Sequence, residues 1–475
     1  MRLALLSLFT LVFTFQIQAQ TLTLAGMQAD FDSLQSALME AHSGLYRYAE
    51  KPAIDQLFKN YRKRLEKPMS QQAFFTFLYQ MLAELKDGHM RMDYGDAVTK
   101  DPALFPFRVW MEENKMIVLS NDTKTDTTIK PGTEILTING QKVSTLQQLI
   151  MTSLPGDGFI TTGKRIKSQR SFSYYYWLLV DQSGAFTITA RNTSGKPFTI
   201  KLSGVTEKER LINRNSNPVN TAILPALAIF DGPKDNLFLD FIHHDSIAVL
   251  RIKSFMGDRF TEEVDSIFTL IGKKQPKAMI LDMRGNGGGE DMYGACLVAQ
   301  FQSKPFRYFD HIWIKKLVPS FAPWKNEVPE DTLMKMVTAN PTGGYFVGPQ
   351  LHPGVAEQAP ARQPFDGKLV VVVNGGTMST ATDAAALLRS LNNPPFVGEE
   401  SGGTYEGNTS GAAAELTLPY SKFKVKIHLY EYFNAVTPAP KGRGIRPGYP
   451  VPTRPGDILR GIDAPMQKAV NIALQ

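Results

Sequence analysis

A serine occupies the junction between a predicted strand and a predicted helix. The apolar run at residues 369–373 is typical of a buried strand, and Thr380 begins a helical segment that extends to residue 390. Residues 374–379 between them read Asn-Gly-Gly-Thr-Met-Ser. A tight turn there exposes a hydroxyl at a helix N-terminus, where the helix dipole favours developing negative charge. Ser379 is therefore a candidate nucleophile, and the alternative is that Thr377, Ser379 or Thr380 only caps the helix.

A second predicted strand also ends in glycines. Residues 278–283 are apolar except for Asp282, and residues 284–289 read Arg-Gly-Asn-Gly-Gly-Gly. Glycines leave backbone N–H groups uncovered, as an oxyanion hole requires. A phosphate-binding loop does not fit, because its Gly-Lys-Ser/Thr ending is missing and Glu290 stands where a G-x-G-x-x-G motif needs glycine. The remaining alternative is a flexible turn.

The histidines offer one motif. His89 ends the sequence Lys-Asp-Gly-His at residues 86–89, after a predicted helix, where a histidine commonly caps or packs. His42 falls on a predicted helix, and the other histidines belong to no motif: His243, His244, His311, His352 and His428. No H-x-x-x-H or H-E-x-x-H pair occurs, so no metal site is expected.

Taken together, these segments resemble peptidase family S41, the relatives of tail-specific (C-terminal processing) proteases and of the tricorn core. The resemblance covers nearly the whole mature chain and rests on four motifs in the same order. These are Asp-Gly-His at 87–89, Asp-x-Arg-Gly-Asn-Gly-Gly-Gly at 282–289, Asn-Gly-Gly-Thr-x-Ser at 374–379 with Gly-Glu-Glu-Ser-Gly-Gly at 398–403, and Gly-Arg-Gly-Ile-Arg-Pro at 442–447. The resemblance implies an α/β protease core of the ClpP/crotonase-like type with a PDZ-like β-rich domain.

The family has two catalytic variants. Tail-specific members pair the serine with a lysine 25 positions later, but Thr404 stands there, and no lysine occurs between Ser379 and Lys422. A serine hydroxyl needs a base within hydrogen-bond reach, and histidine has a suitable pKa. Tricorn-like members take their histidine from the Asp-Gly-His segment, which is His89 here. The resemblance thus implies Ser379 and His89 as catalytic residues without a cofactor or metal. It also implies an oxyanion hole formed by the N–H groups of Gly287, Gly288 and Thr380.

Two positions depart from the family pattern. Lys441 stands where a glutamate is frequent, and Gly448 stands in place of an aspartate. A carboxylate that orients His89 must therefore come from elsewhere, and the candidates are Glu399, Glu400 and Glu406.

Hydrophobic periodicity indicates the elements that position these residues. Helices are predicted within residues 27–87, short strands from 101 to 204 with a helix at 144–153, and aromatic, alternating strands within 171–204. From 237 onward, apolar strands alternate with helices, which indicates an α/β core covered on both faces. We expect an N-terminal helical domain at 20–100, the PDZ-like domain at 101–205, a polar linker at 206–235 and the protease core at 236–475.

The N-terminus predicts export. Met1 and Arg2 precede an apolar run from Leu3 to Phe15, and Ile-Gln-Ala at 17–19 suits a cleavage site, so residues 1–19 read as a signal peptide. The run is too short to span a bilayer, which needs about 20 apolar residues. Cys296 is the only cysteine of 475 residues, so no disulfide forms within the chain. A periplasmic or secreted protein is expected, with no membrane segment after signal removal.

These observations predict an exported serine endopeptidase that acts on polypeptides. The net charge of +7 is spread along the chain without a long basic block, so no nucleic-acid partner is expected. Two alternatives stay open: an inactive ligand-binding member of the same fold, and an exported esterase. We also expect the segment 101–204 to govern substrate access without supplying a catalytic residue. Lys422 is expected on an edge strand at 421–427 whose lysines face water.

Overall fold

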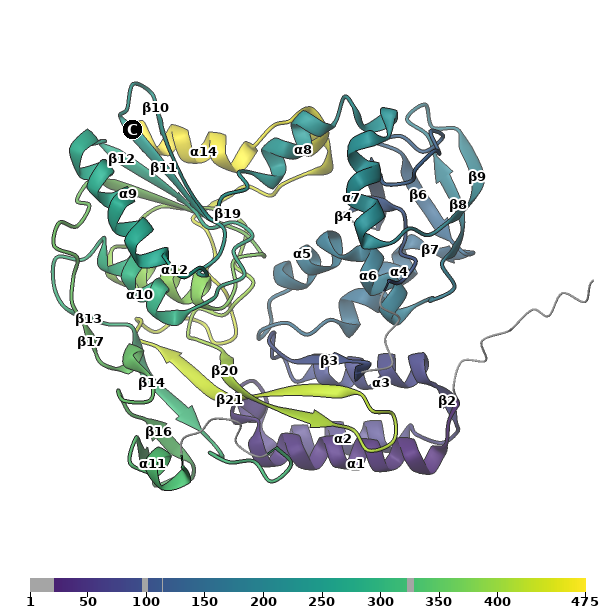
Figure 1. The fold of residues 1–475 in the computed structure, drawn as a ribbon, viewed down its shortest axis with the longest axis horizontal. Coiled ribbons are helices and arrows are strands. Elements are labelled where there is room, and N and C mark those ends of the chain that lie inside the picture. The colour runs from purple at the N-terminus through teal and green to yellow at the C-terminus, as the bar shows by residue number, and fades with distance from the viewer. Residues whose placement is uncertain (1–20, 96–100, 113, 323–328) are drawn as a thin grey trace, which may run out of the picture.

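The computed structural model describes residues 21–95, 101–112, 114–322 and 329–475. The predicted signal peptide lies outside these residues. Figure 1 shows the α/β core and a second β-rich unit standing side by side over a layer of N-terminal helices and long antiparallel strands. No helix in the described part of the chain combines the length and the apolar composition needed to cross a membrane.

The N-terminal layer consists of α1 (Leu24–Ala41), α2 (Lys51–Lys63) and α3 (Gln71–Glu84), as the periodicity predicts. The Thr23 side chain accepts a hydrogen bond from the Gly26 N–H and caps α1. Ser70 caps α3 in the same way through the Ala73 N–H. Short strands complete the layer: β1 (Thr21–Leu22) pairs with β2 (Met69–Ser70), and β3 (Arg91–Asp93) follows the Asp-Gly-His segment.

Residues 101–205, called the middle region below, form an antiparallel sheet with the strand order β4-β5-β6-β8-β9 and β7 paired to β6. The elements are β4 (Phe107–Glu112), β5 (Lys115–Asn121), β6 (Glu134–Ile138), β7 (Gln141–Lys142), α4 (Val143–Ser153), α5 (Thr162–Arg170), α6 (Phe172–Leu179), β8 (Ala185–Arg191) and β9 (Pro197–Ser203). The PDZ-like assignment of this region stays a prediction.

One aromatic segment of the middle region is helical, not extended. Aromatic strands were expected within 171–204, but residues 172–179 form α6. Phe172 and Tyr176, one helical turn apart, are both buried and pack with Phe105. Burial at the helical spacing therefore outweighs the β-propensity of the aromatic residues.

The predicted linker at 206–235 contains two helices, α7 (Glu207–Ser216) and α8 (Leu224–Asp231). Helix α7 begins with a capping box, in which Thr206 and Glu209 satisfy each other's backbone N–H groups. Arg214 on α7 binds both carboxylate oxygens of the buried Asp122, at 3.0 and 2.7 Å. The segment is thus held against the middle region.

The core sheet confirms the predicted α/β architecture. Its strand order is β10-β11-β12-β18-β19-β22, and all neighbours are parallel except β10 and β11. The strands are β10 (Leu237–Ile242), β11 (Ile247–Ile252), β12 (Ala278–Asp282), β18 (Lys368–Val373), β19 (Phe396–Gly398) and β22 (Tyr449–Pro450). The helices of the core are α9 (Phe260–Lys274), α10 (Asp291–Ala299), α12 (Thr380–Leu391), α13 (Pro455–Arg460) and α14 (Ala464–Ala473).

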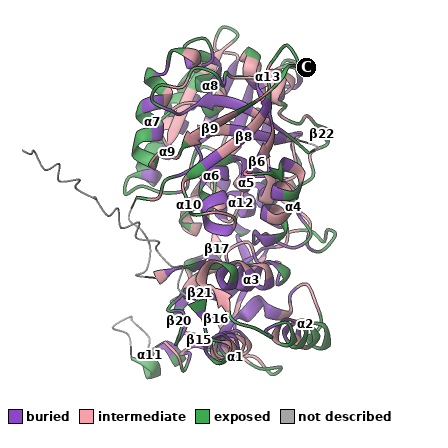
Figure 2. Cartoon of the chain, turned by 90° about the vertical axis from the view of Figure 1, so that its right-hand side faces the viewer, coloured by how far each residue is buried: buried purple, intermediate pink, exposed green. Residues whose placement is uncertain are grey.

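Alternate residues of the central strands face opposite helices. Ile280 and Val370 pack in one cluster with Ile472 of α14. Leu281 and Val371 belong to the main hydrophobic cluster, which includes Leu387 of α12. Figure 2 shows α12 as buried, whereas α2 and α7 present exposed faces. Burial on both faces explains why these strands read as continuous apolar runs.

A second sheet of the C-terminal half has the order β15-β16-β14-β21-β20, with β3 of the N-terminal layer added to β21. Its strands are β14 (Phe309–Ile314), β15 (Val337–Ala339), β16 (Tyr345–Val347), β20 (Thr409–Thr417) and β21 (Lys424–Asn434). Short elements nearby in sequence are α11 (Glu330–Met334), β13 (Phe306–Arg307), η4 (Pro353–Val355) and β17 (Glu357–Gln358). The edge strand expected at 421–427 is wrong, because β21 pairs with β20 on one side and with β3 on the other. Within the segment 421–427, Lys422 and Lys426 are exposed, as expected.

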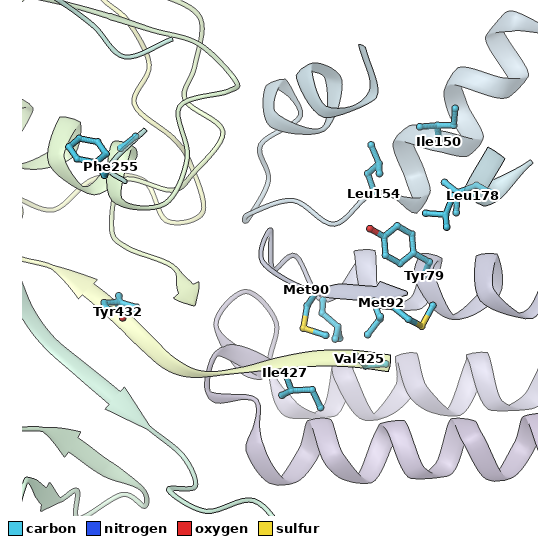
Figure 3. Packing of buried hydrophobic residues seen from close by; sticks show 14 of the residues in the cluster. Tyr79, Met90, Met92, Ile150, Leu154, Leu178, Phe255, Val425, Ile427 and Tyr432 are labelled. Atoms are coloured by element: carbon cyan, nitrogen blue, oxygen red, sulfur yellow. The ribbon is translucent and has the colours of Figure 1, made fainter. Parts of the chain in front are cut away.

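The segment after His89 lies where three parts of the chain meet. Met90 and Met92 lie over Val425 and Ile427 of β21 and below Leu154, which follows α4 in the middle region (Figure 3). Met92 and Val425 are register partners in the β3–β21 pair. The N-terminal layer, the second sheet and the middle region therefore all fix the position of this segment.

Candidate active site

Ser379 has a strained backbone between β18 and α12. Its φ is 53° and its ψ is −137°, which places a residue other than glycine in a left-handed region. Such conformations cost about 1–3 kcal/mol and gather at functional sites. A strained strand-to-helix turn that lifts a serine hydroxyl is the geometry of a nucleophile elbow.

The capping alternative for this turn is wrong. The Ser379 side chain makes no capping hydrogen bond. Its backbone carbonyl accepts from the N–H groups of Thr382 and Asp383, at 2.7 and 3.0 Å. The hydroxyl of Thr377 donates to the carbonyl of Met283 at 2.9 Å. The hydroxyl of Thr380 donates to the carbonyl of Gly289 at 2.8 Å.

Hydrogen bonds join the two glycine-rich turns into one unit. The side-chain oxygen of Asn374 accepts from the N–H groups of Gly285 and Gly376, both at 2.9 Å. The N–H of Met378 donates to the carbonyl of Asn286, also at 2.9 Å. We call residues 284–289 and 374–380 together the serine side of the site.

Gly288 lies directly against the nucleophile. Its φ is +97°, and a methyl group there would lie 2.7 Å from Cβ of Ser379 and 3.0 Å from the backbone nitrogen of Thr380. The Gly288 N–H already donates a hydrogen bond to the side-chain oxygen of Asn286 at 2.9 Å. In the described chain no hydrogen bond uses the N–H of Gly287 or Thr380. Of the three expected oxyanion donors, those two are available, and Gly288 supplies close approach instead.

His89 lies in a buried turn after α3. Its backbone N–H donates to Oδ1 of Asp87 at 2.7 Å, and the ring Nδ1 is 3.9 Å from the same oxygen. Nδ1 is buried and has no hydrogen-bond partner in the described chain, whereas the side chain as a whole is 17% exposed. The exposed edge of the ring is therefore not the Nδ1 edge.

A second histidine holds Asp87. Its Oδ2 is 2.8 Å from Nε2 of His42, and both side chains are buried. Burial favours a higher pKa, but the hydrogen bond and the nearby histidines outweigh it and lower the pKa of Asp87 to about 2. Asp87 is therefore an anion at neutral pH beside the His89 ring.

Further side chains surround His89. The ring of His428, on β21, meets it edge to face at a centroid distance of 5.7 Å. One ring nitrogen of His89 and one carboxylate oxygen each of Asp87 and Asp157 lie within 4.8 Å of one another. Burial lowers the pKa of His89 to about 4 against the opposing field of Asp87. His89 is thus neutral at pH 7, as a general base must be. We call these residues the histidine cluster: His42, Asp87, His89, Asp157 and His428.

Carboxylates and imidazole are also the groups that bind divalent metal ions. Here both oxygens of Asp87 and one oxygen of Asp157 already accept hydrogen bonds. The ammonium of Lys167 supplies positive charge to both carboxylates. Lys167 would therefore repel a cation at this group, and its buried atoms left unpaired in the described chain are Asp157 Oδ2 and His89 Nδ1.

The relation between Ser379 and His89 follows from the contacts that each of them makes. No hydrogen bond, ion pair or ring contact joins them within the described ranges. Helix α5 contacts both sides: Arg170 donates to the carbonyl of Gly285 at 3.2 Å, and Lys167 donates to the carbonyl of Gly88 at 3.0 Å. Figure 1 shows α5 between the core and the rest of the middle region. The relative placement of the two sides therefore depends on this helix.

A threonine, not a base, occupies the position of the catalytic lysine in tail-specific members. Thr404 is buried, and its hydroxyl bonds to the carbonyl of Gly407 and lies 3.1 Å from the hydroxyl of Tyr48. Lys422 is on an exposed turn and donates to the carbonyl of Pro419 at 2.6 Å.

The three glutamates proposed to orient His89 bind other groups. Glu399 pairs with Arg165. Glu400 accepts from the N–H of Gly444 at 3.0 Å, and Glu406 accepts from that of Gly442 at 2.7 Å. None of them makes a hydrogen bond or ion pair with His89. Two carboxylates have an oxygen within 4.8 Å of a His89 ring nitrogen: Asp87, which the sequence motif contains, and Asp157, which lies 68 residues from it in sequence and belongs to no motif. The charge of Asp291 also acts on this ring.

Comparisons with known proteins identify one family and several similar structures. The sequence model of peptidase family S41 matches residues 246–451, which contain the whole serine side. No curated protein matches the chain. The structure of mature CPAF complexed with lactacystin is similar over 95% of this chain and 98% of that chain, with a TM-score of 0.66 and 15% identity.

Two further solved structures are similar. A crystal structure of mature CPAF covers 95% of this chain and 96% of its own, with a TM-score of 0.64 and 15% identity. The match to the photosystem II D1 C-terminal processing protease covers 92% of this chain and 98% of that chain, with a TM-score of 0.42 and 16% identity. The CPAF structures show a shared fold over nearly the whole chain. Residues 246–451 are therefore a peptidase family S41 domain, which supports a serine-type peptidase.

Proposed function

We propose that the protein is an exported endopeptidase that cleaves polypeptides, with Ser379 as nucleophile and His89 as general base. The observation that carries this proposal is the Ser379 turn. It is strained, its hydroxyl caps nothing, and the N–H of Thr380 beside it is free. A structural serine would need none of these features.

Chemistry follows from the two sides of the site. Ser379 Oγ attacks the peptide carbonyl while His89 accepts its proton, and the negative oxygen accepts hydrogen bonds from the N–H groups of Thr380 and Gly287. His89 then gives the proton to the leaving amine, and an acyl-enzyme remains on Ser379. Water, deprotonated by His89, hydrolyses this ester and regenerates the serine.

The reaction requires a hydrogen bond between Ser379 and His89, and the described chain contains none. Catalytic hydrogen bonds are often formed only when substrate is bound, so their absence here does not remove His89 as the base. Helix α5 contacts both turns through Arg170 and Lys167. We propose that a shift of α5 on substrate binding brings the two sides together.

The lack of a hydrogen bond between Ser379 and His89 in the described chain also supports a second candidate, an inactive ligand-binding member of the fold. Residues 20–475 incubated with an unstructured polypeptide and with a small acyl ester distinguish the possibilities. We expect wild type to cleave both and Ser379→Ala to cleave neither. Ester hydrolysis alone would indicate an esterase, and binding without cleavage would indicate the inactive member.

Export is a separate part of the proposal. It rests on the charged start, the short apolar run and the Ile-Gln-Ala site at residues 17–19. N-terminal sequencing of the native protein should find it outside the cytoplasm, beginning at or near Gln20. An intact Met1 on cytosolic protein would contradict this part alone.

A further inference from the structure

The loop between α4 and α5 places a buried carboxylate beside the histidine turn. Asp157, in this loop, is 2% exposed. Its Oδ1 accepts a hydrogen bond from the N–H of Gly88 at 2.6 Å. Its Oδ2 is buried and has no partner in the described chain. Buried carboxylate oxygens are normally hydrogen-bonded, so an unpaired one calls for an explanation.

His89 offers the matching unpaired atom. Its Nδ1 is also buried without a partner. A nitrogen of this ring and an oxygen of Asp157 lie within the 4.8 Å that encloses the whole group with Asp87. An unpaired donor and an unpaired acceptor thus belong to two buried residues that offer ligand atoms within 4.8 Å of each other.

We propose that Asp157 is the carboxylate that positions His89 for catalysis. When the site closes, Oδ2 accepts the Nδ1–H of His89, which leaves Nε2 unprotonated and free to take the proton of Ser379. Asp157 then also stabilises the imidazolium that forms. The inference rests on the proposed function of Ser379 and His89, and it makes Asp157 a positioning residue.

The position of Asp157 depends on how the middle region docks. The N–H of Gly158 donates to the carbonyl of Lys86 at 2.9 Å, and the N–H of Phe159 donates to the carbonyl of Gly442 at 2.8 Å. The loop is therefore attached to the histidine turn on one side and to the core on the other. A region expected only to admit substrate thus supplies the partner of the base, so its movement would switch the base on or off.

The charges that face Asp157 set its pH response. Burial and the negative charge of Asp87 raise the pKa of Asp157 to about 7, against the opposing action of the Gly88 N–H, Lys167 and Arg47. Other ionisable groups that interact with it are His89, Tyr48, Asp383 and Glu406. The ionised carboxylate accepts more strongly, so positioning should improve as the pH rises through about 7.

Asp157→Asn is the decisive variant. Asparagine keeps an oxygen for the Gly88 N–H, but it presents an NH₂ group to His89 and favours the wrong tautomer. We expect kcat/KM on a short substrate to fall about 100- to 10,000-fold, mainly through kcat. In wild type, kcat/KM plotted against pH should begin to fall near pH 7 as the pH is lowered. In the variant this fall should occur at a lower pH, toward the pKa of His89.

A structural role would give a different result. A carboxyl whose folded pKa is raised destabilises the fold once the pH exceeds its unfolded value. Asp157→Asn should therefore leave the melting temperature at pH 8 unchanged or higher. The matched control is Asp30→Asn, because Asp30 is buried and accepts from the N–H groups of Tyr420 and Ser421, at 2.8 and 2.7 Å. This control should lower stability but leave kcat/KM and the pH limb unchanged.

Three outcomes separate this inference from the proposed function. If Asp157→Asn keeps the activity and pH profile of wild type while Ser379→Ala is inactive, the inference about Asp157 is overturned and the proposed function stands. Lost activity with a lower melting temperature at pH 8 would also overturn it, because the role would then be structural. Nitrogen-15 NMR of the His89 ring needs no activity: we expect Nδ1 protonated in wild type and Nε2 protonated in the variant. The same tautomer in both would contradict the inference even if the protein proved inactive.

Discussion

The serine side and the histidine cluster are built in different ways. The serine side comes from two short segments, each of which contains its own glycines and hydrogen-bond acceptors. The histidine cluster draws His42 from the end of α1, His89 from the turn after α3, Asp157 from the middle region and His428 from β21. One side is encoded locally and the other is assembled by tertiary structure.

This difference has a functional consequence. A locally encoded turn keeps its geometry whenever the core sheet is folded. A cluster assembled from several parts responds to any movement between them, and α5 contacts both sides. We infer that the nucleophile is permanently prepared and that the base is the regulated element.

The largest effects should come from removing either reacting side chain. Ser379→Ala and His89→Ala should each lower kcat/KM by about 10⁴-fold or more, because nucleophile and base act as a unit. The double variant should be little worse than either single one. Circular dichroism and melting temperature serve as the control for folding. Effects that multiply in the double variant would show that the two residues act independently.

A smaller loss should follow from Gly288→Ala, which disturbs the serine side alone. The added methyl would lie 2.7 Å from Cβ of Ser379 and at a φ of +97°. We expect kcat/KM to fall about 100- to 1,000-fold, comparable to the loss of one oxyanion donor. Gly272→Ala, in open space on α9, is the matched control. Equal activity in both variants would show that the loop does not adjoin the reacting atoms.

The histidine cluster should be more tolerant of a change in its outer member. His42→Ala removes the partner of Asp87, and a hydrogen bond to a charged group contributes about 1.5–3 kcal/mol to stability. Only part of this acts on His89, so we expect about a tenfold fall in kcat/KM, equivalent to 1.4 kcal/mol. His42→Gln keeps a donor and should recover most of the loss. Full activity in His42→Ala would separate Asp87 from catalysis.

The smallest effect should come from Lys422→Ala. Lys422 is exposed and binds only the carbonyl of Pro419. Surface substitutions of this kind change stability by about 0.5 kcal/mol or less, and kcat/KM should change less than twofold. If Lys422→Ala abolished activity while His89→Ala did not, the base would be a lysine.

The contrast between the two sides also explains what could be predicted from the sequence. Strands β11, β12 and β18 follow from continuous apolar runs, and the serine side follows from glycines next to them. The helix α6 was missed because its aromatic residues have high β-propensity, whereas tertiary burial, for example against Phe105, favours the helix. The edge position assigned to residues 421–427 failed because β3, more than 300 residues earlier, supplies the missing neighbour.

The partner of His89 was missed for the same reason. Glu399, Glu400 and Glu406 were chosen because they lie near the late motifs, yet arginines and backbone N–H groups bind them. Asp157 lies in a Pro-Gly-Asp-Gly sequence that reads as an ordinary turn. No spacing rule links it to His89, because the contact exists only when the middle region docks on the N-terminal layer.

The central claim is that Ser379 is a nucleophile prepared by its own turn. The most direct test treats purified residues 20–475 with a fluorophosphonate probe and identifies the modified residue by mass spectrometry. We expect one label, on Ser379, that Ser379→Ala abolishes and His89→Ala slows strongly. A label on another serine, or none on folded protein that still hydrolyses peptides, would contradict the claim.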